Sequence, residues 1–177
     1  MPELGAGIDE IRQSPKDAGM VHLLVRRPAP SQREILDEAT LDLVHGLVGD
    51  NWKVRGSQHT SDGSADPNAQ ITVMNSRAIA LVAQQKERWP LAGDQIFVDL
   101  DLSRSNLPAG TQLQVGSAVI EITAQPHLGC NQFAARFGKD AVKVVNSSTG
   151  KQLRLRGINA KIVRAGTVRV GDLVKKA

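Results

Sequence analysis

The sequence contains a single cysteine, Cys130, within the segment QPHLGCNQFAARFG. Phe133 and Phe137 are four residues apart, good helix formers lie between them, and Gly138 is a typical helix end. We therefore expect a short helix that begins at about Cys130. The unpaired N–H groups and the dipole at a helix start favour a thiolate, which is a nucleophile and a soft metal ligand. The alternative is a buried, inert cysteine, because free cysteines often pack in protein cores.

A histidine lies close to this cysteine in the sequence. His127 precedes Cys130 by three residues, so both side chains could reach one metal ion, or the imidazole could act beside the thiolate through hydrogen bonding or charge. A histidine that is simply exposed in a loop is the other interpretation. The remaining histidines lack the spacing of metal ligands, and one cysteine excludes a cysteine-rich structural zinc site. No nucleophile elbow or comparable motif supports a hydrolase.

The hydrophobic pattern predicts short strands as the scaffold for these residues. Residues 96–102 alternate between an apolar and a mixed face, and residues 111–124 do the same on either side of a turn at Gly116. Further strands are expected at residues 21–27, at residues 71–73 and on both sides of Ala165-Gly166, with a tight turn at Gly171-Asp172. Many short strands at hairpin spacing indicate a mainly β fold with a barrel core and a few short helices.

Two further helical segments are expected besides the one that follows Cys130. Asn75 or Ser76 can cap a helix that follows the strand at residues 71–73 and runs to about Gln85. A second helical stretch is expected from Asp140, with Gly150 closing the turn after it. The helices would then lie at the ends of strands.

Three segments show less regular patterns. Residues 34–50 are compatible with either a helical turn or a strand. Residues 56–70 are rich in turn-forming residues and lack large apolar ones, so we expect an exposed and mobile loop with nothing to bury. Residues 1–19 show no firm period and are expected to form a flexible N-terminal arm, followed by a single domain over residues 20–177.

The order of several motifs resembles the MOSC domain, the C-terminal module of molybdenum-cofactor sulfurases, which also occurs as a stand-alone protein. Gly93-Asp94 matches the turn that opens a strand, residues 110–116 match a Gly-x-x-Leu-x-Val-Gly hairpin, and residues 126–130 match a Pro-x-x-x-Cys segment. Residues 46–52 resemble that family's Gly-Leu-x-Gly-Asp turn, and residues 166–172 resemble its final strands. The resemblance covers residues 21–174 and implies an α+β fold with a closed or partly open β-barrel.

The resemblance also implies a site. In it, Cys130 faces a cleft and either carries sulfur or ligates the molybdenum of the molybdenum cofactor (molybdopterin), which makes Cys130 and His127 the candidate catalytic residues. The pterin phosphate would need cations and helix N-termini. The candidate cofactor-binding residues are Cys130, Asn131, Asp50, Lys53, Arg55, Arg77, Arg136 and Lys139. Each cation could instead be a solvated surface charge, and for Asp94 we favour a side-chain bond to the backbone of its turn.

Composition narrows the range of partners. The chain has 177 residues and a formal net charge of +4, which favours anionic partners mildly. Aromatic residues make up 3% and tyrosine is absent, so there is little material for stacking on nucleic-acid bases, and no nucleic acid is expected. No apolar run is long enough to span a membrane, and the charged N-terminus cannot act as a secretory signal. A cytoplasmic protein without membrane association is expected.

Two functions from different classes follow. The first is a stand-alone MOSC protein that binds molybdenum cofactor or accepts sulfur through Cys130. By resemblance it would reduce N-hydroxylated compounds with electrons from a separate partner, or receive sulfur from a sulfurtransferase. The chain has no aminotransferase-like lobe, so pyridoxal phosphate is not expected. The alternative is a small, basic, non-enzymatic β-barrel interaction module in which Cys130 is structural.

Overall fold

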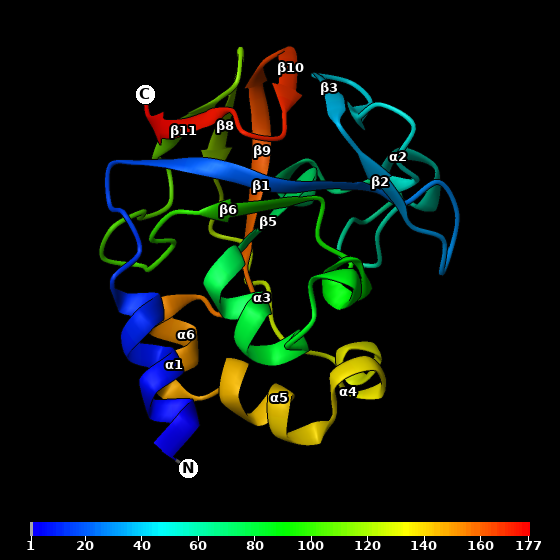
Figure 1. Ribbon diagram of the computed structural model, residues 1–177. Coiled ribbons are helices and arrows are strands. Elements are labelled where there is room, and N and C mark those ends of the chain that lie inside the picture. The colour runs from blue at the N-terminus through cyan, green and yellow to red at the C-terminus, as the bar shows by residue number, and fades with distance from the viewer. Residues whose placement is uncertain (1) are drawn as a thin grey trace.

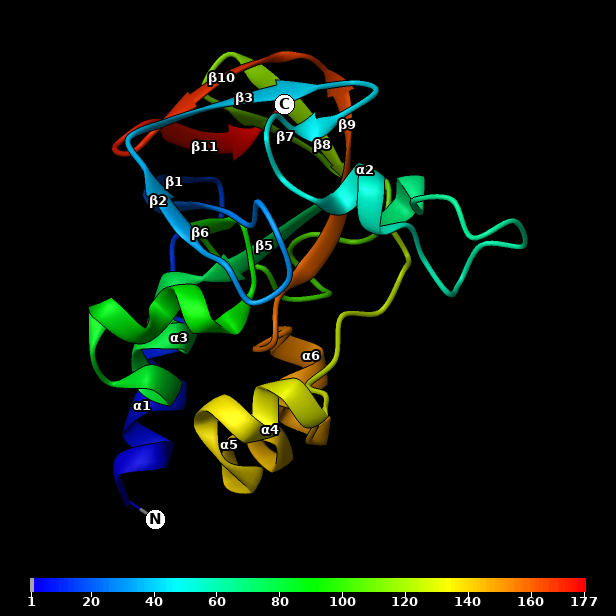
Figure 2. The same ribbon diagram turned by 90° about the vertical axis from the view of Figure 1, so that its right-hand side faces the viewer.

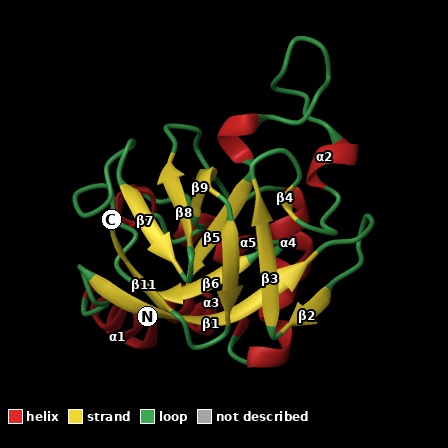
Figure 3. Cartoon of the chain, turned by 90° about the horizontal axis from the view of Figure 1, so that it is seen from above, coloured by secondary structure: helices red, strands yellow, loops and turns green. Residues whose placement is uncertain are grey.

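The chain forms a closed, mixed β-barrel with helices gathered on one side of it (Figures 1 and 3). The computed structural model describes residues 2–177, with side chains from residue 4 onward. The seven barrel strands are β1 (Ala18–Arg26), β5 (Ile71–Asn75), β6 (Ile96–Asp99), β7 (Gln112–Val115), β8 (Ala118–Ile122), β9 (Ile158–Arg164) and β11 (Leu173–Lys176). Their order is β11-β7-β8-β9-β5-β6-β1, and β1 pairs with β11 to close the barrel. Among the described strands, only β5 and β6 pair in parallel. The barrel and its short helices confirm the predicted α+β fold.

A smaller sheet completes the barrel end. It consists of β10 (Gly166–Arg169), β3 (Glu38–Asp42) and β4 (Gly46–Leu47), while β2 (Glu34–Leu36) pairs with the end of β1. Buried Leu41 and Val168 of this sheet belong to the same apolar core as the barrel interior. The structure thus has strands at residues 34–36, 38–42 and 46–47, one of the two alternatives that the pattern of residues 34–50 left open.

Alternation along the strands produces a second core between barrel and helices. Ile96 and Val98 face the barrel interior, whereas Phe97 points outward and packs with Trp89 and Phe133. The helices on this side are α1 (Pro2–Arg12), α3 (Ser76–Ala83), α4 (Asn131–Phe137), α5 (Lys139–Val145) and α6 (Ser148–Leu153), as Figure 1 shows. A 3-10 helix (Lys86–Ala92) follows α3, and another (Pro67–Ala69) precedes β5. The four-residue helix α2 (Trp52–Arg55) lies apart from this group (Figure 2).

Several local predictions are confirmed. Asn75 caps α3, since its side-chain oxygen accepts hydrogen bonds from the N–H groups of Arg77 and Ala78. Cys130 occupies the N-cap position of α4 and Gly138 ends that helix. Gly116 forms the turn between β7 and β8 with a positive φ of 57°, the region that glycine tolerates best.

Other predictions need correction. Residues 2–12, where the sequence shows no firm period, form α1, which packs against α3 and buries Ile11. The predicted flexibility of this N-terminal segment and the division into an arm and one domain stay predictions. Gly150 does not close a turn but lies inside α6, where a Cβ would come 2.2 Å from the carbonyl oxygen of Val144.

The loop over residues 56–70 is exposed only in part. It projects from the body of the molecule in Figure 2. Ala65, Asp66 and Gln70 near its end are nevertheless buried, and Trp52 donates a 3.3 Å hydrogen bond from its ring N–H to the carbonyl of Asp66. The expectation that nothing in this loop could be buried is therefore wrong. These residues are buried because the end of the loop leads into β5, which lies in the core. Among the described residues, no helix is both long and apolar enough to cross a membrane.

Candidate functional site

The single cysteine opens onto a cavity of about 410 Å³, which we call the Cys130 pocket. Its walls come from the turn after β1, the start of α2, the turn before β6 and the segment that leads into α4. The charged and polar residues that line it include Arg27, Arg33, Asn51, Arg55, His127, Cys130, Arg136, Arg156 and Asn159. Five of these are arginines, so the pocket is strongly cationic.

Cys130 is held by backbone geometry rather than by its side chain. It has an extended conformation (φ −123°), and its carbonyl accepts the first hydrogen bond of α4, from Ala134 N–H at 2.9 Å. Asn146 at the end of α5 fixes the preceding residue: its amide accepts from Gly129 N–H at 2.8 Å and donates to Gly129 C=O at 3.0 Å. The thiol is exposed and caps no helix N–H group. The alternative of a buried Cys130 is thereby excluded, and the sulfur is available to a ligand.

Three arginines of the pocket lack an acidic partner among the described residues. Arg33 donates to the carbonyls of Pro90 (3.0 Å) and Gln32 (2.7 Å), and Arg136 donates to that of Leu91 (2.8 Å). Arg55 donates no side-chain hydrogen bond in this part of the chain. These interactions fix the direction of the guanidinium groups without neutralising them.

The pKa shifts of two of these arginines reflect this excess of positive charge. Partial burial, and then the charges of Arg136 and Arg27, lower the pKa of Arg33 from its ordinary value. Desolvation by the surrounding pocket and the charge of Arg27 lower the pKa of the exposed Arg55 in the same way. Like charges are therefore held together in a partly desolvated place, where an anion would relieve their repulsion.

Asp50 supplies one compensating charge, and Arg27 uses it. The Asp50 carboxylate has no exposed surface and accepts from Arg27 Nε at 2.9 Å, Nη2 at 2.8 Å and N–H at 2.8 Å, and from Trp52 N–H at 3.0 Å. Burial opposes its ionised form, but the hydrogen bonds and charge of Arg27 outweigh burial and lower the pKa of Asp50. Asp50 therefore shapes the wall and does not line the pocket.

A second buried carboxylate organises His127 and Arg156. Asp94 accepts hydrogen bonds from Arg156 and, at 2.9 Å, from His127 Nε2, and its side chain is fully buried. Burial opposes ionisation, but the charges of Arg156 and His127 and their hydrogen bonds outweigh it, so the pKa of Asp94 is lowered. The structure corrects our interpretation of Asp94 as a simple turn residue, since both carboxylate oxygens bond to side chains distant in sequence.

This arrangement sets the proton position on His127. Burial, followed by the charge of Arg156, lowers the pKa of His127 despite the opposing effect of Asp94. The imidazole is then neutral near pH 7, and its Nε2–H donates to the ionised Asp94. Nδ1 keeps its lone pair and can accept a proton or a hydrogen bond. Histidine oriented by a carboxylate in this way is a common arrangement at functional sites.

A glycine permits this close approach. Gly157 has a φ of 119°, and a Cβ on it would lie 2.6 Å from the carbonyl oxygen of Val73, 3.1 Å from the His127 ring and 3.2 Å from Asp94 Oδ1. Arg156 beside it lies over the Phe133 ring, 4.8 Å from the ring centroid, and donates to the carbonyl of Ala92 at 2.9 Å. The two residues just before β9 thus supply the cation and the space that the Asp94 and His127 pair requires.

The structure brings together some of the residues that the sequence predicted and separates others. Cys130, His127, Arg55 and Arg136 line the Cys130 pocket. Arg77 lies elsewhere, paired with Asp99 at 2.8 Å and bonded to the carbonyl of Glu10. The predicted residues that do not line this pocket are Asn131, Asp50, Lys53, Arg77 and Lys139.

Sequence reasoning missed several residues of the site. Asn51 lines the pocket with a buried side-chain oxygen that has no hydrogen-bond partner among the described residues. Arg27 and Arg33 flank the run PAPSQ after β1, and this basic turn was a usable signal. Arg156 and Asn146 carried no such signal, because their partners are 62 and 17 residues away in the sequence.

Comparison with known proteins identifies the class of protein. The chain combines a closed mixed barrel, helices on one side of it and a cysteine at a cationic pocket. The family model of the MOSC domain matches residues 60–175, and the chain belongs to the MOSC domain family. No curated protein sequence matches it significantly.

Solved structures are similar in fold. YuaD from Bacillus subtilis superposes with a TM-score of 0.62 at 17% identity, covering 90% of this chain and 95% of that one. YiiM from Escherichia coli gives 0.56 at 18% identity, covering 89% and 69%. YiiM from Geobacillus stearothermophilus gives 0.55 at 12% identity, covering 90% and 73%. These likenesses confirm the fold.

Proposed function

We propose that the protein binds the molybdenum cofactor in the Cys130 pocket, with Cys130 as a sulfur ligand of molybdenum and the pocket arginines around the pterin phosphate. One observation carries the proposal: an exposed thiol shares a pocket with Arg33, Arg55 and Arg136, none of which has an acidic partner among the described residues. Membership of the MOSC family supports the same ligand, because that family is associated with this cofactor.

The set of donor residues suits a metal that arrives within an organic ligand. Among the described residues, no group of three or more histidine, cysteine, aspartate or glutamate side chains could hold a bare metal ion. A single thiolate is a soft ligand, and it can complete the coordination of a metal whose other ligands come from the cofactor. The unpaired oxygen of Asn51 offers a hydrogen-bond acceptor for a ring N–H in the same pocket.

The residues of the chain would then divide the work. Arg33 and Arg136, already directed by backbone carbonyls, bind phosphate with little loss of side-chain entropy. Cys130 fixes the metal end, and neutral His127 accepts a hydrogen bond or proton at Nδ1. When bound, the cofactor supplies two-electron redox chemistry, which fits the reduction of N-hydroxylated compounds with electrons from a separate protein.

Sulfur transfer is the second candidate, and the exposure of the thiol favours it. In this reaction, the Cys130 thiolate attacks the outer sulfur of a persulfide on a sulfurtransferase. A new sulfur–sulfur bond forms on Cys130, the old one breaks, and the donor leaves as a thiolate. No net oxidation is needed, because the persulfide supplies the sulfur already oxidised.

The test is elemental and mass analysis of protein purified from a cell that makes the cofactor. We expect molybdenum and pterin with the wild type, and loss of molybdenum from the Cys130→Ser variant, because a hydroxyl is a harder and weaker ligand of nearly equal size. Circular dichroism of the variant checks that the barrel is intact. One additional sulfur on Cys130 without molybdenum would instead support sulfur transfer. If wild type and variant hold equal molybdenum, or neither holds molybdenum or sulfur, the interaction-module alternative replaces the proposal.

A further inference from the structure

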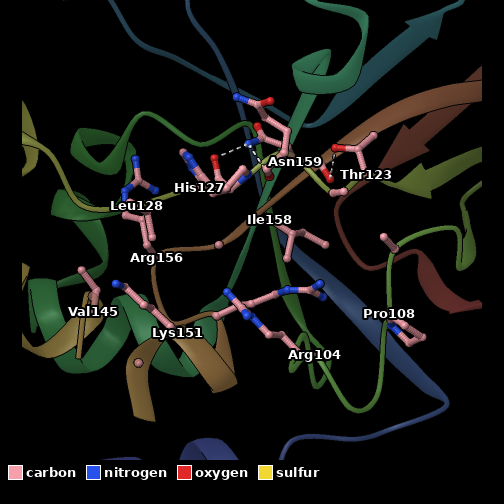
Figure 4. A pocket seen from close by; sticks show the side chains of 17 residues that line it. Arg104, Pro108, Thr123, His127, Leu128, Val145, Lys151, Arg156, Ile158 and Asn159 are labelled. Carbon is pink, nitrogen blue, oxygen red and sulfur yellow. Dashed lines mark hydrogen bonds between the residues drawn. The ribbon is translucent and has the colours of Figure 1, made fainter. Parts of the chain in front are cut away.

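A second cationic cavity of about 360 Å³ lies next to the Cys130 pocket, and we call it the Arg154 pocket. Four of its lining residues are cations: Arg104, Lys151, Arg154 and Arg156, of which Arg156 is paired with Asp94. Among the described residues that line it, none is acidic. Figure 4 shows Arg104 and Lys151 at one end of the pocket, Thr123 and Asn159 at the other, and Ile158 between them.

Arg154 is fixed in place by the backbone. Its Nη1 donates to the carbonyls of Leu102 (3.2 Å) and Leu107 (2.6 Å), which leaves Nε and Nη2 without a protein partner in the described chain. The residue ends α6 in the left-handed conformation (φ 51°), which few residues other than glycine adopt without cost. Arg154 therefore occupies a backbone position that glycine or asparagine would adopt at a lower cost.

The surroundings make this charge costly. Partial burial, and then the charge of Arg104, lower the pKa of Arg154. Neither Arg104 nor Lys151 makes a side-chain ion pair or hydrogen bond within residues 4–177. The rest of the wall is mixed, with polar residues such as Thr123 and Asn159 and apolar ones such as Pro108, Val145 and Ile158. An anion with an apolar body would compensate the cations and cover the apolar residues beside them.

The two pockets are neighbours that share Arg156, but each also has cations of its own. Both are lined by Gln125, Pro126, His127, Arg156 and Asn159, which form the wall between them. The amide of Asn159 donates to the carbonyls of Gln125 and Pro126, at 3.2 Å each, and holds this wall together (Figure 4). Cys130 lines only the Cys130 pocket, so the Arg154 pocket is a distinct site.

We infer that the Arg154 pocket binds a small organic oxyanion, either a phosphate monoester or a carboxylate that is joined to an apolar group. This binding does not depend on the molybdenum cofactor. An occupant would lie against the wall that contains His127 and Arg156, which also lines the Cys130 pocket. This is the position that an anionic substrate would take.

The test is a calorimetric titration of the full chain, prepared from cells that lack the cofactor, with phenyl phosphate. Benzoate distinguishes carboxylate from phosphate recognition, and phenol tests whether the anion is needed. We expect binding of one or both anions and none of phenol. In the Arg104→Gln/Lys151→Gln double variant, affinity should fall at least tenfold, since each charge-assisted contact contributes about 1.5 to 3 kcal/mol. Both side chains are exposed, so the variant should fold.

A matched control removes a similar charge without touching the pocket. Lys143 is exposed on α5, pairs loosely with Asp140 at 3.7 Å, and does not line the Arg154 pocket, so Lys143→Gln should bind like the wild type. Amide chemical shifts should move at Lys151 and Arg154 and stay constant at Arg33 and Arg136. Undiminished affinity in the double variant, shifts confined to Arg33 and Arg136, or no binding of either anion would overturn the inference. Molybdenum loading through Cys130 would be unaffected by that failure, so the two proposals can fail separately.

Discussion

The arginines of the Cys130 pocket fall into two groups. Arg27 and Arg156 are almost fully buried, and each is paired with its own buried carboxylate, Asp50 or Asp94. Arg33 and Arg136 are only partly buried and donate to backbone carbonyls. The same side chain thus serves two purposes in one wall: the paired arginines hold the fold, and the unpaired ones keep their charge for a ligand.

The difference follows from the cost of removing a charge from water. A buried guanidinium without a counter-charge is unstable by several kcal/mol, so full burial requires the carboxylate. A half-buried guanidinium keeps part of its hydration and needs no partner, although crowding by Arg136 and Arg27 still lowers the pKa of Arg33. Pairing is therefore a better indicator of an arginine's role than its presence in the pocket.

Removal of a paired carboxylate should have the largest effect. In Asp94→Asn the Arg156 charge stays buried without compensation, and we expect the free energy of unfolding to fall by about 3 to 5 kcal/mol. Urea denaturation measures it. The control is Asp62→Asn in the exposed loop, where the carboxylate bonds only to Ser64 and the change should stay within about 0.5 kcal/mol. A loss below about 1 kcal/mol in Asp94→Asn would show that this pair does not hold the wall.

The pH dependence of stability should reveal the neutral His127. An unfolded histidine titrates near pH 6.5, whereas burial lowers the pKa of His127 in the folded protein. Between the two values the unfolded state binds more protons, so stability is complete above about pH 6.5 and falls as the pH decreases, by up to about 1.4 kcal/mol per unit. The charged groups that act on the His127 ring are Asp94, Arg156 and Arg27.

Denaturation of cofactor-free protein between about pH 7.5 and about pH 5.5 tests this expectation. The wild type should lose stability across this interval because of His127, and His127→Asn should lose correspondingly less. Equal slopes in the two proteins would contradict a neutral, buried imidazole.

Removal of an unpaired arginine should change stability least. Arg136→Gln loses one hydrogen bond to Leu91 and relieves the repulsion with Arg33, so the free energy of unfolding should change by about 1 kcal/mol or less. The comparison is Arg27→Gln, which leaves buried Asp50 without its cation and should be far less stable. Similar losses in the two variants would remove the distinction between the groups.

Much of the fold could be predicted from the sequence because it rests on local patterns. Alternation identified β6, β7 and β8, and the spacing of Phe133 and Phe137 with Gly138 at the end identified α4. The helical α1 was missed because its apolar residues are few, and its docking depends on contacts with α3, far along the chain.

The site was less predictable, because charge pairing is decided in three dimensions. Nothing in the sequence distinguishes Arg77 from Arg136. In the structure, however, Asp99 on β6 neutralises Arg77 on α3. Asp94 was interpreted from its turn alone, although His127 and Arg156, 33 and 62 residues away, determine its role. The Cys130 motif was found because its helix and its cysteine are adjacent in the sequence.

The central claim is that unpaired arginines beside Cys130 bind the phosphate of the cofactor, and one binding titration tests it most directly. Molybdenum cofactor released from a donor protein is titrated into the apoprotein, its Arg136→Gln variant and its Arg77→Gln variant. Arg136→Gln should bind ten- to hundredfold more weakly, as the loss of a charge-assisted contact of about 1.5 to 3 kcal/mol requires, while Arg77→Gln should bind like the wild type. Equal affinity in the wild type and Arg136→Gln, or equal weakening in both variants, would contradict the account.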